Sequence, residues 1–271
     1  DDMRALVAKI KKYISIWISL FNNSLTRDME FKANFIGGII VDFIFYGTHF
    51  FFFSIIFSYV DSLLEFTKHD VMIFLIITFL SDTVYMFLFS GNLMKINQLI
   101  VKGDLDFFLL KPISSQFLVS FRYVKSYTII SLLILGFLLF KMCLDSPRDI
   151  EFINLAFFIL SFIFGLIIWA SFDFCISCLS FWFKNFSTGG WFSHEVMKFS
   201  MRPDTIYAGW LRKTLFTVLP MAFITSIPTR ILIFGPSKSY FIGQIFIVII
   251  FLLMTRLMWN KGIAKYESAS S

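Results

Sequence analysis

The sequence predicts an all-α integral membrane protein with six transmembrane helices. Hydrophobic residues make up 58% of the 271 residues, whereas only 15% are charged, and soluble domains carry about a quarter charged residues. The apolar residues also come in continuous runs of about 20, the length of a membrane-spanning helix. A spanning β-strand would instead alternate polar and apolar residues over about ten positions. Together these observations favour a helical bundle in lipid.

The N-terminal part, residues 1–33, predicts an amphipathic helix that lies along the membrane surface. Apolar residues recur at helical spacing between Ala5 and Leu25, and Lys9 and Lys12 lie toward the other side. Such a helix places its apolar face in the headgroup region of the lipid. A plain anchor with lysines reaching into water and a specific interface helix fit this pattern equally well. The remaining residues, 34–271, are predicted to form one transmembrane domain.

Five apolar runs are long enough to cross a membrane. They are Phe35 to Val60, Val71 to Ser90, Phe117 to Phe140, Phe152 to Phe183 and Tyr240 to Trp259. Loops rich in Lys and Arg stay in the cytoplasm. The segment from Arg4 to Lys32 holds six basic residues and that from Gly91 to Lys125 holds five, so both are predicted to be cytoplasmic. Lys261 and Lys265 place the C-terminus on the same side.

Two cytoplasmic ends require an even number of spans, so one more must follow the fourth. The stretch from Thr214 to Phe234 is apolar but carries Pro220 and Pro228, which would break two turns of an ordinary helix. The stretch from Phe186 to Arg202 is short and holds ionisable side chains, which are tolerated facing a cavity or another subunit. The positive-inside count favours the first candidate. We predict the second, on the family resemblance given below, with Pro203 to Pro236 as a broken re-entrant segment in the outer leaflet.

A polar interruption from Gly91 to Gln116, residues 91–116, separates the second and third spans. Gly103 and Asp104 open a short helix within it, and Lys111 and Pro112 end that helix. Its apolar side chains are predicted to be knobs presented to a soluble cytoplasmic partner. These knobs are Leu105, Phe108, Leu109 and Leu110. The loop therefore looks like a docking surface and not a catalytic one.

No motif for catalysis is present in the sequence. It has no Gly-x-x-x-x-Gly-Lys-Ser/Thr loop, no His-Glu-x-x-His and no Gly-x-Ser-x-Gly, so we expect no ATP hydrolysis by this chain alone. The three histidines and three cysteines form no spaced ligand set, and no metal site is predicted. Cys175 and Cys178 lie in an apolar helical run, where packing is favoured over redox chemistry. No basic and aromatic face predicts a nucleic-acid partner.

Ionisable side chains within the spans are the candidate functional residues of the membrane part. Asp82 lies in the second predicted span, Asp173 in the fourth, and Asp42 and His49 in the first. Two interpretations stay open for them. They either pair with hydroxyls, lysines or each other and fix the packing of the bundle, or they line a proton relay or the wall of a polar substrate path.

A tighter group lies in the predicted fifth span. His194 and Lys198, four residues apart, share one helical face, and Glu195 lies between them in the sequence. Lining a pathway or gate and a structural role are equally open for this group. We take as candidates for the translocation path or gate Asp82, His194, Glu195, Lys198, Pro220 and Pro228.

The order of these features resembles a known family. A surface helix and a long first span precede the loop, which carries Gly103-Asp104-Leu105-Asp106 and Leu110-Lys111-Pro112-Ile113. Phe181-Trp182 closes the fourth span, and Leu219-Pro220 follows it. The tail begins at Gly262 and reads Gly-Ile-Ala-Lys-Tyr-Glu-Ser. The chain is similar to permease subunits of the type-2 ABC (ABC-2) exporters. More narrowly, it resembles the bacterial branch whose loop carries Gly-x-Leu-Asp and Leu-Lys-Pro.

This resemblance implies a mechanism. Two permease subunits, the same chain or related chains, would pair in the bacterial cytoplasmic (inner) membrane above two ATP-binding subunits. ATP and Mg would be bound by those partners, and no cofactor by this chain. The loop would be the coupling helix, and substrate would pass along the seam between permeases. The coupling residues would be Gly103, Asp104, Leu105, Asp106, Phe108, Leu109, Lys111 and Pro112.

Two other classes of function remain compatible with the residues. A proton-coupled secondary carrier would use Asp82, Asp173 and the group around His194 and would need no ATPase partner. A membrane scaffold would use the docking loop for assembly alone. An aromatic, apolar lining would suit a lipid, a hydrophobic peptide or a drug, but phenylalanines that face lipid give the same composition, so the sequence names no substrate.

Overall fold

The protein is a bundle of long apolar helices. The computed structural model describes residues 2–148, 150–183, 186 and 188–266, and 80% of it is helical. Four helical stretches are long and apolar enough to cross a membrane: Lys32–Ile56, Lys68–Lys102, Phe152–Phe181 and Lys238–Lys265. The prediction of an all-α membrane protein is therefore confirmed.

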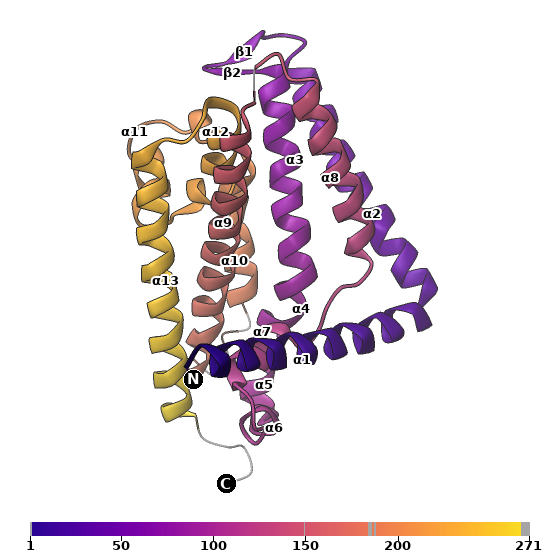
Figure 1. The fold of residues 1–271 in the computed structure, drawn as a ribbon, viewed down its shortest axis with the longest axis vertical. Coiled ribbons are helices and arrows are strands. Elements are labelled where there is room, and N and C mark those ends of the chain that lie inside the picture. The colour runs from indigo at the N-terminus through magenta and orange to yellow at the C-terminus, as the bar shows by residue number, and fades with distance from the viewer. Residues whose placement is uncertain (1, 149, 184–185, 187, 267–271) are drawn as a thin grey trace.

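The long stretches are built from several elements. They comprise α2 (Lys32–Ile56), α3 (Lys68–Tyr85) with a π-helical turn η1 (Met86–Ser90) and α4 (Gly91–Leu93), α5 (Ile96–Lys102), α9 (Phe152–Cys178) with a 3-10 turn η2 (Leu179–Phe181), and α13 (Lys238–Lys265). At 1.5 Å per residue, the 28 residues of α13 extend about 42 Å, more than the hydrocarbon core of about 30 Å. In Figure 1, α3, α9 and α13 run alongside one another.

The helix α3 is the centre of the packing. In the most apolar 18 residues of the stretch Lys68–Lys102, which begins with α3, 61% of the residues are buried. The corresponding share is 11% in α2 and 17% in α13. Large side chains such as Phe74 and Phe79 are almost fully buried there. The helices α2 and α13 instead expose rows of large apolar side chains, which is expected of faces that meet lipid or another subunit. Cys175 and Cys178 are free and buried in α9, as packing residues would be.

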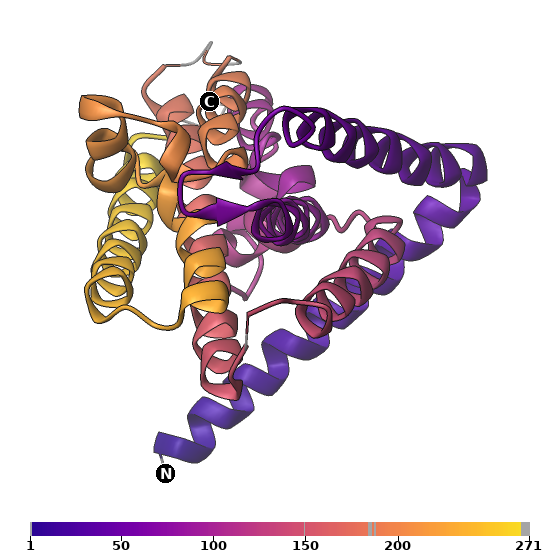
Figure 2. The ribbon, with the colours of Figure 1, turned by 90° about the horizontal axis from the view of Figure 1, so that it is seen from above.

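The N-terminal helix α1 (Asp2–Glu30) lies across one end of the bundle. Figure 1 shows it running crosswise to α3, α9 and α13, and Figure 2, seen from above, shows it as a long diagonal along one side of the molecule. Tyr13 meets the ring of Phe117 edge-on at 4.8 Å, and its hydroxyl accepts a hydrogen bond from the backbone N of Ser114 at 3.2 Å. These two contacts join α1 to the start of α7.

The third predicted span begins later than expected. The apolar run from Phe117 is broken at residues 122–127, between α7 (Ser115–Phe121) and the 17-residue α8 (Thr128–Leu144). Polar side chains satisfy the backbone at this break. Ser24 Oγ accepts from the N of Val124 at 3.2 Å, and Asp28 Oδ2 accepts from the N of Ser126 at 3.1 Å. The charged residues Arg122 and Lys125 are a sign of this break in the sequence. Both acceptors come from α1, however, so the span itself did not show how the backbone at the break is satisfied.

The predicted fifth span is a short helix. The helix α10 (Gly189–Met197) has nine residues and is followed by a 3-10 turn η3 (Lys198–Met201). Nine residues extend only about 14 Å, so α10 alone does not cross the hydrocarbon core. Two charged residues of this segment, Lys198 and Glu195, form an ion pair with each other at 2.5 Å.

The following segment folds into two short helices separated by an irregular turn. They are α11 (Gly209–Thr217) and α12 (Ser226–Phe234), with 3-10 turns η4 (Asp204–Ile206) and η5 (Met221–Phe223). Gln244 of α13 donates from Nε2 to the carbonyl oxygen of Phe223 at 2.9 Å. A Cβ on Gly165 of α9 would lie 2.5 Å from the carbonyl oxygen of Ile224, so only glycine permits this approach. Protein groups thus enclose the backbone that the turn leaves free of helix hydrogen bonds.

The opposite end from α1 is held by a short hairpin and ion pairs. The strands β1 (Ser62–Leu63) and β2 (Phe66–Thr67) are antiparallel and lead into α3. Asp70 closes a capping box with Thr67 and is fully buried, and Arg148 from the connection before α9 donates to it at 3.1 Å. These contacts tie the start of α3 to the start of α9.

The cytoplasmic loop predicted after the second span contains α5, a four-residue helix α6 (Asp106–Leu109) and α7. It lies at the same end of the molecule as α1 and the last turns of α13 in Figure 1. Gly103 ends α5 with φ 77°, in the left-handed region that favours glycine.

Candidate functional site

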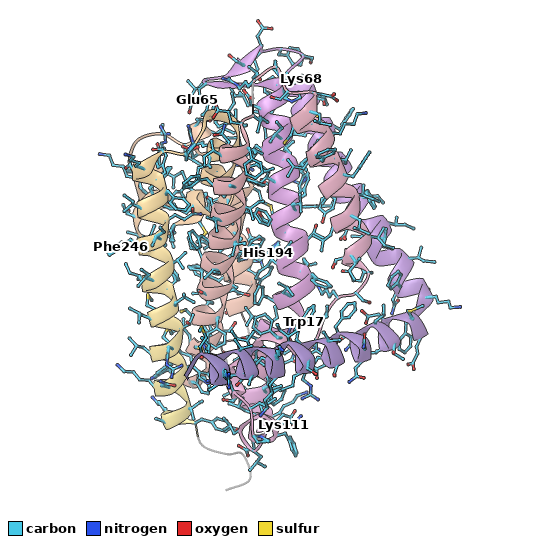
Figure 3. All side chains as sticks on the ribbon, in the orientation of Figure 1. Trp17, Glu65, Lys68, Lys111, His194 and Phe246 are labelled. Carbon is cyan, nitrogen blue, oxygen red and sulfur yellow. The ribbon has the colours of Figure 1, made fainter. Side chains whose placement is uncertain are left out.

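A cavity of about 570 Å³ opens between α2, α3, α9 and α10. Carboxylates from three helices line it: Asp42 of α2, Asp82 of α3 and Asp173 of α9. His194 of α10 completes the lining, and Figure 3 shows this residue midway between the two ends of the molecule. The cavity therefore collects polar groups from four elements in the middle of an apolar bundle.

One face of α9 supplies the wall of the cavity. Trp169, Asp173, Ser177 and Ser180 follow one another at helical spacing and all line it. The hydroxyl of Tyr85 donates a hydrogen bond to Asp173 Oδ2. The ring of Tyr85 also stacks on Trp169, with centroids 4.3 Å apart and an angle of 3° between the planes. The carboxylate of Asp173 is thus held in place by its neighbours.

The other two carboxylates differ in their contacts. Asp42 Oδ2 accepts a hydrogen bond from Ser131 Oγ of α8 at 3.1 Å. Asp82 has neither a hydrogen bond nor an ion pair with any residue that the structure describes. Lys125, in the break before α8, lies within electrostatic reach of both carboxylates but does not line the cavity. Asp82 is therefore the carboxylate left most available to a bound group.

A second cavity of about 460 Å³ adjoins the first through His194 and Phe45. Its lining is basic and aromatic, with His49, Lys198 and Arg202 among the residues. Of the predicted path residues, Asp82 and His194 meet in the first cavity and Lys198 lines the second. Three predicted residues, Glu195, Pro220 and Pro228, line neither of them. Both prolines are buried, in the segment between α10 and α13.

The predicted apolar knobs of the loop are wrong in part. Leu105 is fully buried and Phe108 is 4% exposed, because both pack into the chain's own core. Leu109 is half-buried, and only Leu110, 83% exposed, faces outward as expected. Its exposed partner is Phe107, at 66%, which the sequence pattern had not singled out.

The C-terminal tail reaches the same loop. Tyr266, just after α13, is half-buried. Burial, and then the carboxylates of Asp106 and Asp104, raise the pKa of Tyr266. The polar side of α6 is therefore turned toward the tail, which leaves Phe107 and Leu110 as the exposed apolar part of the loop.

Several lining residues were absent from the sequence-based list of path residues. They are Tyr46, Tyr85, Asn97, Trp169, Ser177 and Ser180. The stripe on α9 could have been found, since its members recur every three or four residues around Asp173. Asn97 carried no such signal, because its importance depends on the hydrogen-bond partner that its Nδ2 lacks among the described residues.

Among the described parts of the chain, no three His, Cys, Asp or Glu side chains lie close enough to hold a metal ion together. The carboxylates of the cavity stand apart from one another on three helices. They are placed to face a delocalised positive charge on a larger molecule, but they do not form the coordination sphere of a metal ion.

Long apolar helices around a polar cavity, with α1 and a polar loop at one end, define a multi-pass membrane protein. The family model described as ABC-2 family transporter protein matches residues 43–270, and the chain belongs to this family. Its members are non-catalytic membrane components of transporters. Neither the curated proteins nor the solved structures compared with the chain gave a match.

Proposed function

We propose that this chain is the permease subunit of an ATP-driven ABC exporter in a bacterial cytoplasmic membrane. Membership of the ABC-2 family supports transport. The basic residues near Gly91 to Lys125 and in α1 support a cytoplasmic position for the end that carries both termini. In this proposal the four long helical stretches make four membrane crossings, α8 makes one, and α10 with its continuation η3 makes the sixth.

The observation that carries the proposal is the exposed apolar pair on the loop. Phe107 and Leu110 lie three residues apart at α6 and are 66% and 83% exposed. Leu105 and Phe108 anchor the same short helix in the core, and the Arg122 guanidinium lies 4.9 Å from the Phe108 ring. An apolar pair on a firmly anchored turn is suited to docking into a groove of a soluble subunit.

The polar neighbours of this pair fit the rim of such a contact. Lys111 is exposed beside Leu110, and Figure 3 shows it at the extreme end of the molecule, far from Glu65. Asp104 is half-buried near the start of the turn. We assign Phe107 and Leu110 to the centre of the interface with an ATP-binding subunit, and Asp104 and Lys111 to its rim.

The proposed assembly has two permeases, identical or related, and two ATP-binding subunits that bind ATP and Mg. The exposed apolar face of α2, which includes Val41 and Ile44, borders the cavity and is available to the second permease. Substrate would pass through the cavity between α2 and α9. Closure of the ATP-binding subunits would move the loop and, through α7, the helices on either side of the cavity.

The test replaces the exposed pair with charged residues. In the double variant Phe107→Asp, Leu110→Asp, we expect the ATP-binding subunits to be lost from the gently solubilised complex, while the permease is inserted normally. The matched control is Tyr59→Asp, which changes an 85% exposed aromatic residue beyond the other end of α2. Mass spectrometry of the purified complex and its ATPase rate give the result.

Normal retention of the ATP-binding subunits in the double variant would refute the docking surface. Absence of any ATP-binding subunit from the unaltered complex would refute the exporter itself. In that second case the proton-coupled carrier becomes the better hypothesis, since Asp82, Asp173 and His194 share one cavity. Transport driven by a pH gradient and lost in Asp82→Asn would then support it.

A further inference from the structure

We infer that the central cavity binds an amphipathic organic cation. We take this cation as the transported substrate, and that part of the inference rests on the proposed function. Three carboxylates line the cavity, from Asp42, Asp82 and Asp173. No lysine or arginine is among its described lining residues, and His194 is the one histidine there. Carboxylates held in an apolar bundle are costly unless a positive group compensates them.

The compensation within the chain is incomplete. Tyr85 and Ser131 donate hydrogen bonds to Asp173 and Asp42, but these donors are neutral. Lys125 reaches Asp42 and Asp82 electrostatically from outside the lining, and its Nζ lies 3.6 Å from Met86 Sδ. A positively charged guest would therefore favour the ionised form of these carboxylates and pair with it.

Two buried polar groups at the cavity point independently to a ligand. Ser180 is 1% exposed, and its hydroxyl has no hydrogen-bond partner among the described residues. The Nδ2 of Asn97 is also buried without such a partner. Both residues line the cavity. Buried polar groups are nearly always hydrogen-bonded, so an oxygen of the bound molecule is a natural acceptor for the Asn97 amide.

The rest of the lining suits an apolar body with delocalised charge. The stacked rings of Tyr85 and Trp169 form part of the wall, 4.3 Å apart, and aromatic faces attract organic cations. A volume of about 570 Å³ lies in the range of small-molecule sites, roughly 300–1,000 Å³. The carboxylates are too dispersed to hold a metal ion among the described residues, which favours a larger cation.

The experiment uses two probes of nearly equal shape and opposite charge. Tetraphenylphosphonium, a cation, and tetraphenylborate, an anion, are dialysed to equilibrium against the full-length protein in detergent, with all subunits that copurify and with empty micelles as the blank. We expect saturable binding of tetraphenylphosphonium that tetraphenylborate does not displace.

Asp82→Asn is the informative variant, because Asp82 has no partner in the described structure that the change would disrupt. We expect it to weaken tetraphenylphosphonium binding about tenfold or more, as loss of one nearby charge in a partly desolvated site would. Asp145→Asn, at an exposed carboxylate beyond α8, is the control and should leave the affinity unchanged.

Three results would overturn the inference: no saturable cation binding, equal or tighter binding of the borate, or unchanged affinity in Asp82→Asn. None of them bears on the exporter, which is judged by the ATP-binding subunits that copurify. Conversely, charge-selective binding that depends on Asp82, in a protein that purifies without ATP-binding subunits, would support the cation site and refute the exporter.

Discussion

The carboxylate of Asp204 holds together the end of the molecule opposite α1, and its removal should destabilise the fold strongly. Asp204 is 1% exposed. It accepts hydrogen bonds from Arg230 Nε at 3.0 Å and Nη2 at 3.2 Å, and from Arg212 Nη2 at 2.7 Å. Arg230 also pairs with Glu65 of the β1–β2 turn at 2.5 Å. Asp204→Asn would leave two guanidinium groups facing a neutral amide.

The magnitude follows from the burial of the partners. Breaking a buried ion pair by removing one partner costs about 3–5 kcal/mol. The Arg230 side chain is 11% exposed and receives little screening, whereas Arg212 is 41% exposed, so we take the lower end, about 3 kcal/mol. For a chain of this size each kcal/mol lowers the Tm by about 2–4 °C, which gives a fall of about 6–12 °C.

The assay is thermal denaturation followed by fluorescence-detected size-exclusion chromatography. Asp145→Asn, at an exposed carboxylate, is the control and should shift the Tm by less than about 1 °C. Arg230→Met should cost more than Arg212→Met, because Arg230 makes two bonds to Asp204 and is more deeply buried. An unchanged Tm in Asp204→Asn, or the reverse order of the two arginine variants, would refute the reasoning.

Two further predictions concern the turn between α11 and α12 and the tail after α13. Gln244→Leu removes the donor to the Phe223 carbonyl and the acceptor of the Ser161 hydroxyl, so it should cost about 1–3 kcal/mol; an unchanged Tm in the same assay would contradict this. Burial, and then the carboxylate of Asp106, raise the pKa of Tyr266. The neutral phenol is therefore favoured in the folded state, and the stability it contributes is present below the ordinary tyrosine pKa of about 10 and lost as pH rises through the raised value. Ultraviolet titration should show one fewer late-titrating tyrosine in Tyr266→Phe than in the unaltered protein, and identical titration curves would count against it.

The four long apolar helices were predictable because a run of 20 apolar residues has few alternatives in lipid. The break before α8 was not, since its backbone groups are satisfied by Ser24 and Asp28, about 100 residues earlier in the chain. The burial of the Leu105 and Phe108 side chains was missed for a related reason. A helix of four residues, α6, has too little periodicity to show which side is buried.

For the candidate site, intramembrane charge was the useful signal. It pointed to Asp82 and His194, which do meet in the cavity. It could not separate them from Glu195, which forms a pair with Lys198 away from the cavity lining. Charged residues mark where polarity is tolerated, but only the packing of α9 and α10 decides which of them face a common space.

The two ends of the bundle are held by different kinds of contact. At the end opposite α1, the buried carboxylates of Asp70 and Asp204 pair with Arg148 and Arg230 from distant segments. At the end that carries α1, the break at residues 122–127 separates α7 from α8, and hydrogen bonds to α1 stabilise it. Breaking an ion pair at a buried carboxylate costs about 3–5 kcal/mol. A neutral hydrogen bond, such as that from Val124 to Ser24, contributes about 0.5–1.5 kcal/mol, and one to a carboxylate, such as that from Ser126 to Asp28, about 1.5–3 kcal/mol. Under the proposed function, a force applied at Phe107 and Leu110 would therefore bend the chain at this break and leave the end opposite α1 closed. Lys125 lies within the break, so such a movement would also change the field that it exerts on Asp42 and Asp82 in the cavity.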